Sequence, residues 1–198
     1  MRNPAADLAF PSLFLVLMAI PPQAVQADEI GPMRPYICDS SLSTVTYKAI
    51  HPFATVRGVS RAPACTVWVD PDTVAFRVRV SVPARSFKSG LALRDSHAMK
   101  AVEADKYPRV EFTSNAVTPE DGKVGPYSLA GELTFHGETR PVSMAVTPRL
   151  ENGKALIRGA FPVSLAAYKV KPPSLMMNRV KDTVTLSFDL AFDLPPAK

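Results

Sequence analysis

The stretch SFKSGLALRDSHAMKAVEADKYPRVEFTS, residues 86–114, is where an otherwise regular β pattern stops and then starts again. In its middle, the alternation of apolar and polar residues gives way to a short helical pattern that Asp95 or Ser96 could cap. Pro108 disfavours a helical conformation at Tyr107, so the helix must end there. We therefore expect one short helix set between β-strands, lying over one end of the sheet.

On both sides of this stretch the residues alternate with a period of two. VAFRVRVSV, residues 74–82, places apolar side chains on one face and arginines on the other, and TVTLSFDLAFDL, residues 183–194, alternates without a break. A sheet with one dry and one wet face is typical of antiparallel strands. Eight or nine such strands can form a sandwich or a barrel, and long strands joined by short turns favour a meandering barrel. About eight strands close around room for one small or elongated ligand.

The N-terminal residues are expected to be a cleaved signal peptide, residues 1–27. Its apolar core is LAFPSLFLVLMAI, residues 8–20, and Val25-Gln26-Ala27 places small residues at a signal-peptidase site. A retained membrane anchor is the alternative, although a span usually needs ~20 apolar residues. Beyond the signal we expect a leader at 28–35, one domain at 36–194 and a tail at 195–198. Secretion would place the mature protein in the periplasm or outside the cell.

Two cysteines, Cys38 and Cys65, lie in the mature part of the chain. In an oxidising compartment an even number of cysteines indicates a disulfide. Two buried free thiols or an intermolecular bond remain as alternatives. Two cysteines alone cannot form a closed zinc site.

The formal net charge of +5 is mildly basic, and the charges are spread along the chain. No Lys/Arg cluster is interleaved with stacking aromatic residues, so we expect no nucleic-acid partner. A basic surface suits transient contact with anionic lipid head groups, and a face that is simply solvated is the commoner alternative.

Arg94, Asp95 and His97 form a polar group that invites a catalytic interpretation. However, no GxSxG motif surrounds Ser86 or Ser89, and no oxyanion site is indicated. We expect no enzyme activity; the group is either a polar network at the helix start or a contact for a ligand head group. The histidines at 51, 97 and 136 lack metal-ligand or haem-attachment spacing, so we expect no metal and no cofactor.

Two motif blocks are similar to those of the YceI-like family of secreted polyisoprenoid- and lipid-binding proteins. The first is Arg94-Asp95-x-His97 followed by Lys106-Tyr107-Pro108, and the second runs from Gly131 through His136-Gly137-x-Thr139-Arg140-Pro141-Val142. Their order and spacing both agree with the family, and the resemblance covers residues 36–194. It implies an all-β fold, an eight-stranded antiparallel lipocalin-like barrel with one short helix capping an end. The implied role is non-enzymatic: a monomer or homodimer that holds an isoprenoid or other lipid for transport, storage or stress protection.

The resemblance also implies where a ligand would lie. Residues expected to line the interior are Val78, Val80, Leu133, Phe135, Met144, Leu186 and Phe188. Residues expected at the entrance, near a head group, are Arg94, Asp95, His97, His136 and Arg140.

The chain departs from the family pattern in three places. SSLS at 40–43 replaces a His-Ser-x-Val stretch, the segment between His97 and Tyr107 is short, and SLAAYKVKPPSLMMNRVKD at 164–182 replaces an Asn-Arg-x-x-Phe-Gly motif. Two alternative functions therefore stay open: a haem- or quinone-linked periplasmic accessory factor, and a structural module without a ligand.

Overall fold

A computed structural model of the chain describes residues 33–72, 75–115, 117, 126–175 and 178–193. The expected signal peptide at 1–27, most of the leader and the tail at 195–198 lie outside the described residues. Most of the domain that was expected at 36–194 lies within them.

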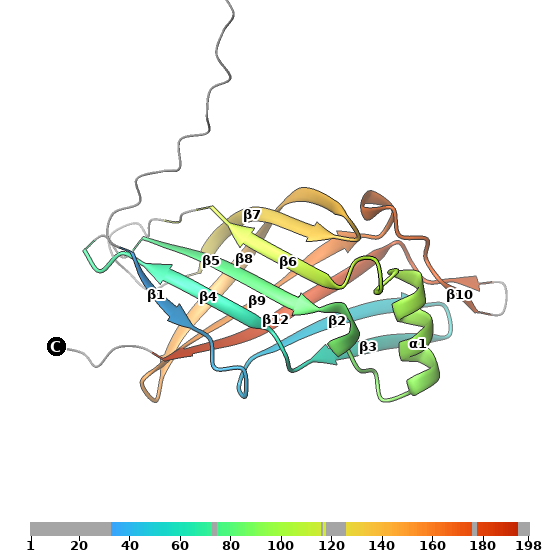
Figure 1. Cartoon of the computed structure of the whole chain (residues 1–198), viewed down its shortest axis with the longest axis horizontal. Coiled ribbons are helices and arrows are strands. Elements are labelled where there is room, and N and C mark those ends of the chain that lie inside the picture. The colour runs from blue at the N-terminus through green and yellow to red at the C-terminus, as the bar shows by residue number, and fades with distance from the viewer. Residues whose placement is uncertain (1–32, 73–74, 116, 118–125, 176–177, 194–198) are drawn as a thin grey trace, which may run out of the picture. The chain divides into compact units, whose positions relative to one another are not determined.

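Ten strands form one antiparallel sheet in the order β1-β4-β5-β6-β7-β8-β9-β12-β2-β3 (Figure 1). Their bounds in chain order are Arg34–Ile37 (β1), Thr44–His51 (β2), Ala54–Ser60 (β3), Ala64–Val69 (β4), Phe76–Pro83 (β5), Arg109–Ser114 (β6), Tyr127–Phe135 (β7), Glu138–Glu151 (β8), Lys154–Ser164 (β9) and Thr183–Asp193 (β12). A two-stranded hairpin, Ser174–Leu175 (β10) and Asn178–Arg179 (β11), stands apart. The expected all-β antiparallel class is confirmed, but the sheet is a strongly curled half-barrel of ten strands, not a closed barrel of eight.

The strand count is higher because residues 37–50, whose composition is typical of a single strand, belong to two strands. The chain leaves β1 at Ile37, crosses six residues and re-enters the sheet at Thr44 as β2. The backbone N–H of Cys38 donates to the carbonyl of Cys65, while that of Asp39 donates to Ala191 in β12. β1 and β2 therefore pair with different neighbours, and the local composition does not show this break.

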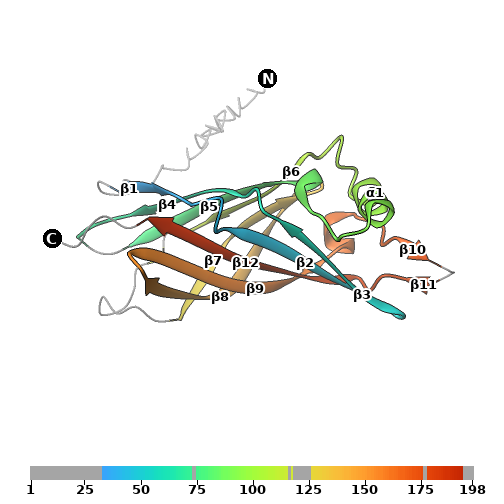
Figure 2. The same ribbon diagram turned by 90° about the horizontal axis from the view of Figure 1, so that it is seen from below.

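The six-residue link between β1 and β2 forces the sheet to curl. These strands are the first and the ninth in the sheet. In a flat sheet they would lie about 38 Å apart at ~4.8 Å per strand, whereas the link spans about 24 Å at most when fully extended. The other edge is also held, because Val59 in β3 and Lys88 exchange two backbone hydrogen bonds of 2.9 and 3.0 Å. Figure 2 shows the resulting curvature.

The disulfide between Cys38 and Cys65 is present, with the Cα atoms 5.4 Å apart. It joins the end of β1 to β4, and both sulfurs are buried in a cluster with Phe192, which has no exposed surface. Ala191, the residue before Phe192, points to the opposite face and is also buried, and its N–H donates a hydrogen bond to the hydroxyl of the buried Ser43. The link is thus hydrogen-bonded to β12 at both of its ends, through Asp39 and Ser43.

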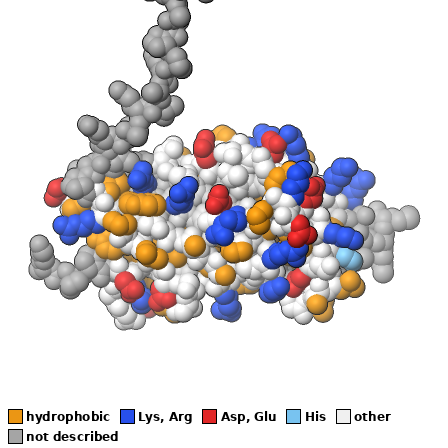
Figure 3. All heavy atoms as spheres, in the orientation of Figure 1, with side chains coloured by type: hydrophobic (Ala, Val, Ile, Leu, Met, Phe, Trp, Pro, Cys, Tyr) orange, Lys and Arg blue, Asp and Glu red, His pale blue; other side chains and the backbone are white. Residues whose placement is uncertain are grey.

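The apolar faces predicted from alternation lie on the concave side. Val78 and Val82 of β5 are buried there, as are Leu190 and Phe192 of β12. Charged side chains are spread over the outer surface (Figure 3).

The predicted helix is present as α1, Ala92–Ala101, at one end of the sheet (Figure 1). None of its side chains is buried, so it lies on the surface. The prediction that Asp95 or Ser96 caps it was wrong, because the residue at the N-cap is Leu91. Asp95 lies in the first turn, where its carboxylate accepts hydrogen bonds of 2.9 and 2.5 Å from the backbone and hydroxyl of Ser89.

The exit from the helical segment packs on the turn between β7 and β8. His136 and Gly137 form this turn with φ values of 51° and 78°. The ring of Tyr107 lies so close to Gly137 that a Cβ added there would be 2.6 Å from its Cε1 atom. The Lys-Tyr-Pro and His-Gly motifs are therefore two halves of one packing contact.

We predict that the Cys38–Cys65 bridge contributes about 3–4 kcal/mol, because it closes a long loop in the unfolded chain. Replacing both cysteines with serine should lower the free energy of unfolding in denaturant titrations by this amount. The intact protein, denatured without a reductant, should show no free thiol. Two reactive thiols in that assay would rule the bridge out.

We also predict that Gly137→Ala destabilises the fold more than Gly153→Ala. Both glycines are the second residue of a two-residue hairpin turn, with φ values of 78° and 76°, but an added Cβ at Gly153 meets nothing within 4 Å. The shared backbone cost should be about 1–2 kcal/mol, and overlap with Tyr107 should add about 1–3 kcal/mol at Gly137 only. Equal losses in thermal and denaturant unfolding would show that Tyr107 does not constrain the turn.

Candidate functional site

The concave face of the half-barrel encloses an apolar cavity. Seven strands contribute to its wall, and all fourteen lining side chains are apolar: Val45, Val78, Val80, Val82, Val110, Phe112, Leu129, Leu133, Met144, Ile157, Phe161, Leu186, Phe188 and Leu190. They share this face because alternate residues of each strand point inward. The wall can hold hydrocarbon but offers no side chain for acid–base or metal chemistry.

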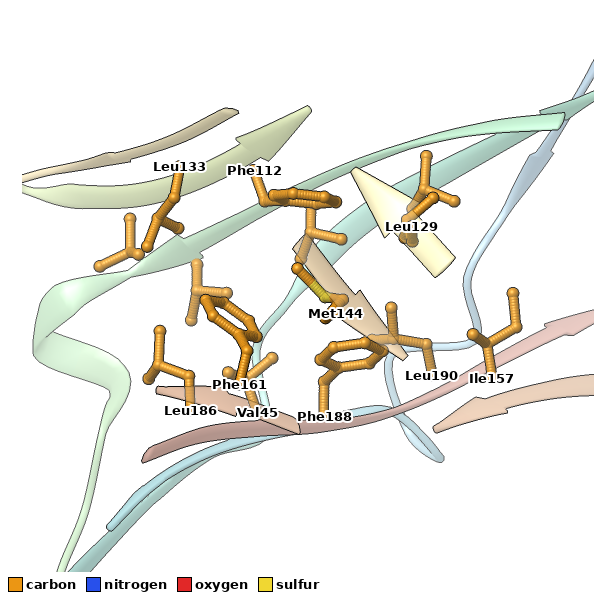
Figure 4. Close-up of a pocket in the computed structure, with 14 residues that line it drawn as sticks. Val45, Phe112, Leu129, Leu133, Met144, Ile157, Phe161, Leu186, Phe188 and Leu190 are labelled. Atoms are coloured by element: carbon orange, nitrogen blue, oxygen red, sulfur yellow. The ribbon is translucent and has the colours of Figure 1, made fainter. Parts of the chain in front are cut away.

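Large flexible or aromatic side chains fill the middle of the cavity. Figure 4 shows Met144 among the rings of Phe112, Phe161 and Phe188. Phe188 lies over Gly159, its partner on β9, where an added Cβ would be 2.5 Å from the ring. The space left for water-sized groups is about 60 Å³. As it stands, the interior is closer to a packed core than to an open pocket.

Six of the seven residues expected to line the interior do lie at this cavity: Val78, Val80, Leu133, Met144, Leu186 and Phe188. Phe135 does not. It is the last residue of β7, and its ring packs against Tyr168 with the centroids 5.6 Å apart. Tyr168 ends the short 3-10 helix Ala166–Tyr168 (η3).

Several residues that line the cavity were not among those expected from the sequence. Phe112 and Leu190 follow the same alternation as the residues that were chosen, so the period-two pattern could have found them. Phe161 is harder to find, because the nearby Gly159 and Pro162 suggest a bent strand. In the structure β9 pairs with β12 in unbroken register through this region.

The expected entrance residues divide into two groups. At the first, the charges of Asp95 and Arg94 act on the half-buried phenol of Tyr47, whose pKa is raised mainly by burial and further by the charge of Asp95. The hydrogen bond from the Ser89 hydroxyl lowers the pKa of Asp95 itself. His97 is exposed on α1. This group therefore keeps a charged carboxylate in the neighbourhood of a half-buried phenol.

The second group surrounds His136, whose side chain is buried. Its Nδ1 lies 2.9 Å from the carbonyl oxygen of Tyr168, and its Nε2 lies 3.3 Å from a carboxylate oxygen of Glu103. The ring of Tyr107 packs on it with centroids 4.6 Å apart. Arg140 is exposed, 4.0 Å from the carboxylate of Glu138. His136 is thus held by packing and is not an open surface contact.

Burial raises the pKa of Tyr168. Its hydroxyl is buried and makes no hydrogen bond with any described residue. The end of the half-barrel near α1 therefore carries a buried phenol, Tyr168, and a half-buried one, Tyr47, both packed against the apolar core.

The three histidines lie apart. His51 faces the ring of Phe53, 5.5 Å away, while His97 and His136 belong to the two groups above. Among the described residues, no group of three or more His, Cys, Asp or Glu side chains could hold a metal ion. In the described part of the chain, no helix is both long and apolar enough to cross a membrane.

Solved structures share this fold. BcnA of Burkholderia cenocepacia superposes with a TM-score of 0.69 at 23% identity, covering 78% of this chain and 98% of that one. A polyisoprenoid binding domain from Saccharophagus degradans superposes with a TM-score of 0.61 at 14% identity, covering 81% and 98%. The YceI protein of Campylobacter jejuni gives a TM-score of 0.60 at 16% identity, covering 72% and 87%.

The chain also has relatives in sequence. A UPF0312 protein of Vibrio vulnificus is 29% identical over 137 residues, which is 66% of this chain and 67% of the relative. A UPF0312 protein of Pseudomonas putida is 33% identical over 82 residues, 40% and 42% of the two chains. The family model described as the YceI-like domain matches residues 36–192, the whole of the half-barrel apart from the first strand's opening and the last residue of β12. The chain therefore belongs to the YceI-like family.

Proposed function

We propose that this protein binds the apolar chain of an isoprenoid or another lipid inside its half-barrel. The observation that carries the proposal is the wall of fourteen side chains without a single polar group. The Saccharophagus degradans domain of the same fold is described as polyisoprenoid-binding, which supports the same ligand class here. In this role the protein carries or stores its ligand and does not transform it.

The size of the cavity defines how binding must occur. The free space of about 60 Å³ is well below the ~300–1,000 Å³ of typical ligand pockets. A lipid chain can enter only if side chains in the middle move aside. Met144 is suited to this movement, because an unbranched thioether repacks at little cost. Phe188 can move only away from Gly159, which already touches its ring.

We propose that the two phenols near α1, Tyr47 and Tyr168, receive the polar end of the ligand. Tyr168 has an unpartnered hydroxyl there, and a buried polar group without a partner costs about 1–3 kcal/mol. Arg94, Asp95 and Arg140 lie near these phenols, so they are the proposed entrance residues. His136 supports this part of the fold by packing against Tyr107 and the backbone of Tyr168.

We also propose that the protein acts after export, in the periplasm or outside the cell. The Cys38–Cys65 bridge supports this location, because disulfides persist in oxidising compartments.

The small free volume favours one competing function, a structural module whose interior stays filled. The two functions differ in a measurable way. A carrier gains stability when an apolar chain enters, since ligand binds the folded state alone. A filled module gains none.

We predict that protein purified from its own host carries a lipid. Native mass spectrometry should show added mass, and organic extraction should release an apolar chain that can be identified. Delipidated protein should then take up isoprenoid or fatty-acyl probes with saturation. Neither copurified lipid nor saturable uptake would leave the filled module as the function.

We further predict that Phe161→Leu strengthens the binding of an apolar probe while Phe192→Leu does not. Both rings are buried on the concave face, but only Phe161 lines the cavity. If the enlarged space admits one or two more methylenes, at about 0.8 kcal/mol each, the dissociation constant should fall about four- to fifteenfold.

Both substitutions should destabilise the ligand-free protein by similar amounts, about 1–3 kcal/mol. The pair therefore separates an effect on the cavity from a general loosening of the core. Fluorescence titration with a chain-length series measures it. Equal affinities for both variants would place the ligand elsewhere.

A further inference from the structure

We propose that the end of the half-barrel that carries α1 docks onto an anionic lipid bilayer. This surface, called the α1 end below, consists of residues 84–106, the β2–β3 turn and residues 169–175 and 178–182. This docking goes beyond the proposed binding in the cavity. It does not depend on that binding, because the observations behind it concern charged and exposed side chains on the outer surface.

The α1 end holds the whole charge excess of the protein. Residues 84–106 and 169–182 contain nine Lys and Arg against four Asp and Glu, a net +5, which equals the net charge of the complete chain. The other residues balance to zero. These charges are spread along the sequence, but folding brings the two basic segments together. Figure 3 shows several Lys and Arg side chains at this end, with acidic and apolar side chains between them.

Backbone hydrogen bonds show that the three segments are neighbours. Lys88, just before α1, pairs with Val59 of β3. Lys181 donates its N–H to the carbonyl of Ile50, next to the β2–β3 turn. Both ribbon views place α1, this turn and the β10–β11 hairpin at the same end (Figures 1 and 2).

Some of the cations at the α1 end are neutralised and others are not. Arg85 pairs with Asp105, and Lys169 pairs with Glu138. Lys100, Lys171 and Lys181 are exposed and form no ion pair within 4 Å of a described acidic group. These free ammonium groups can attract lipid phosphates across about one Debye length, ~8–10 Å.

Large apolar side chains project among these cations. Leu91 is 55% exposed, Leu93 is 72% exposed and Phe53, in the β2–β3 turn, is 69% exposed. They account for three of the six strongly exposed large apolar residues of the described chain. Apolar side chains that enter the interface next to basic residues are the usual means by which proteins hold a membrane surface, because neither attraction suffices alone. A binding site for a soluble anion would require the lysines, but it would not account for the exposed leucines.

The test is co-sedimentation of the full mature protein with vesicles. Wild type should bind mixed phosphatidylcholine–phosphatidylglycerol vesicles, bind pure phosphatidylcholine much less, and be released by high salt. Lys100→Glu/Lys181→Glu should lower the partition coefficient at least about tenfold. The matched control, Arg79→Glu/Arg149→Glu, changes two exposed arginines outside the α1 end and alters the net charge by the same amount, so it should stay within about twofold of wild type.

The apolar part is tested in the same way. Leu91→Ser/Leu93→Ser should weaken vesicle binding about tenfold, whereas Leu150→Ser, which removes a leucine that is 64% exposed on β8, should not. All changed positions are exposed, and circular dichroism and thermal melting would verify folding. If a variant does not fold, the lipid and salt dependence of wild type still decides.

Three results would overturn the proposal: equal binding to neutral and anionic vesicles, equal losses for test and control variants, or a dimer in light scattering that the leucine substitutions dissolve. The last would make the α1 end an interface between two copies. Vesicle binding without uptake of lipid probes would uphold this inference and reject the proposed cavity function. Uptake without vesicle binding would do the reverse.

Discussion

The six residues between Ile37 and Thr44 are the constraint on which the rest of the structure depends. They connect the first strand of the sheet to the ninth, and no flat arrangement lets so short a segment do that. The sheet must curl until its first strands approach its last. The Cys38–Cys65 bridge, the N–H of Asp39 on Ala191 and the burial of Phe192 then hold the two sides together. The dry interior is a consequence of this link.

The curl also explains why the interior is both apolar and crowded. Seven strands direct alternate side chains toward one axis, so valine, leucine and phenylalanine meet there. A protein that must be stable without its ligand needs these side chains to pack, and a protein that admits a ligand needs some of them to move. Met144 satisfies both needs at the centre of the cavity. A close contact that leaves no room for a larger side chain lies outside the cavity, where the ring of Tyr107 packs on Gly137.

Most of the fold could be predicted, because its strands follow a simple alternation that is a local property. Phe188 and Val78 were placed correctly from that pattern alone. The break after Ile37 could not be predicted, since it depends on which strands the chain meets and not on its own residues. The surroundings of His136 could not be predicted either: it was expected at the entrance near a head group, and the structure buries it against Tyr107 and the backbone of Tyr168, which come from two distant segments. Phe135 follows the alternation of the lining residues but lies beyond the cavity. Alternation predicts the face to which a side chain points and not how far along the strand the cavity extends.

The contact between Ser43 and Ala191 joins residues that are 148 positions apart. Contacts of such separation form late, because the loop between them must first be closed. The seam of the half-barrel therefore cannot close before β12 has been synthesised, so the strands near the start of the sheet must wait for a strand that follows them by more than a hundred residues.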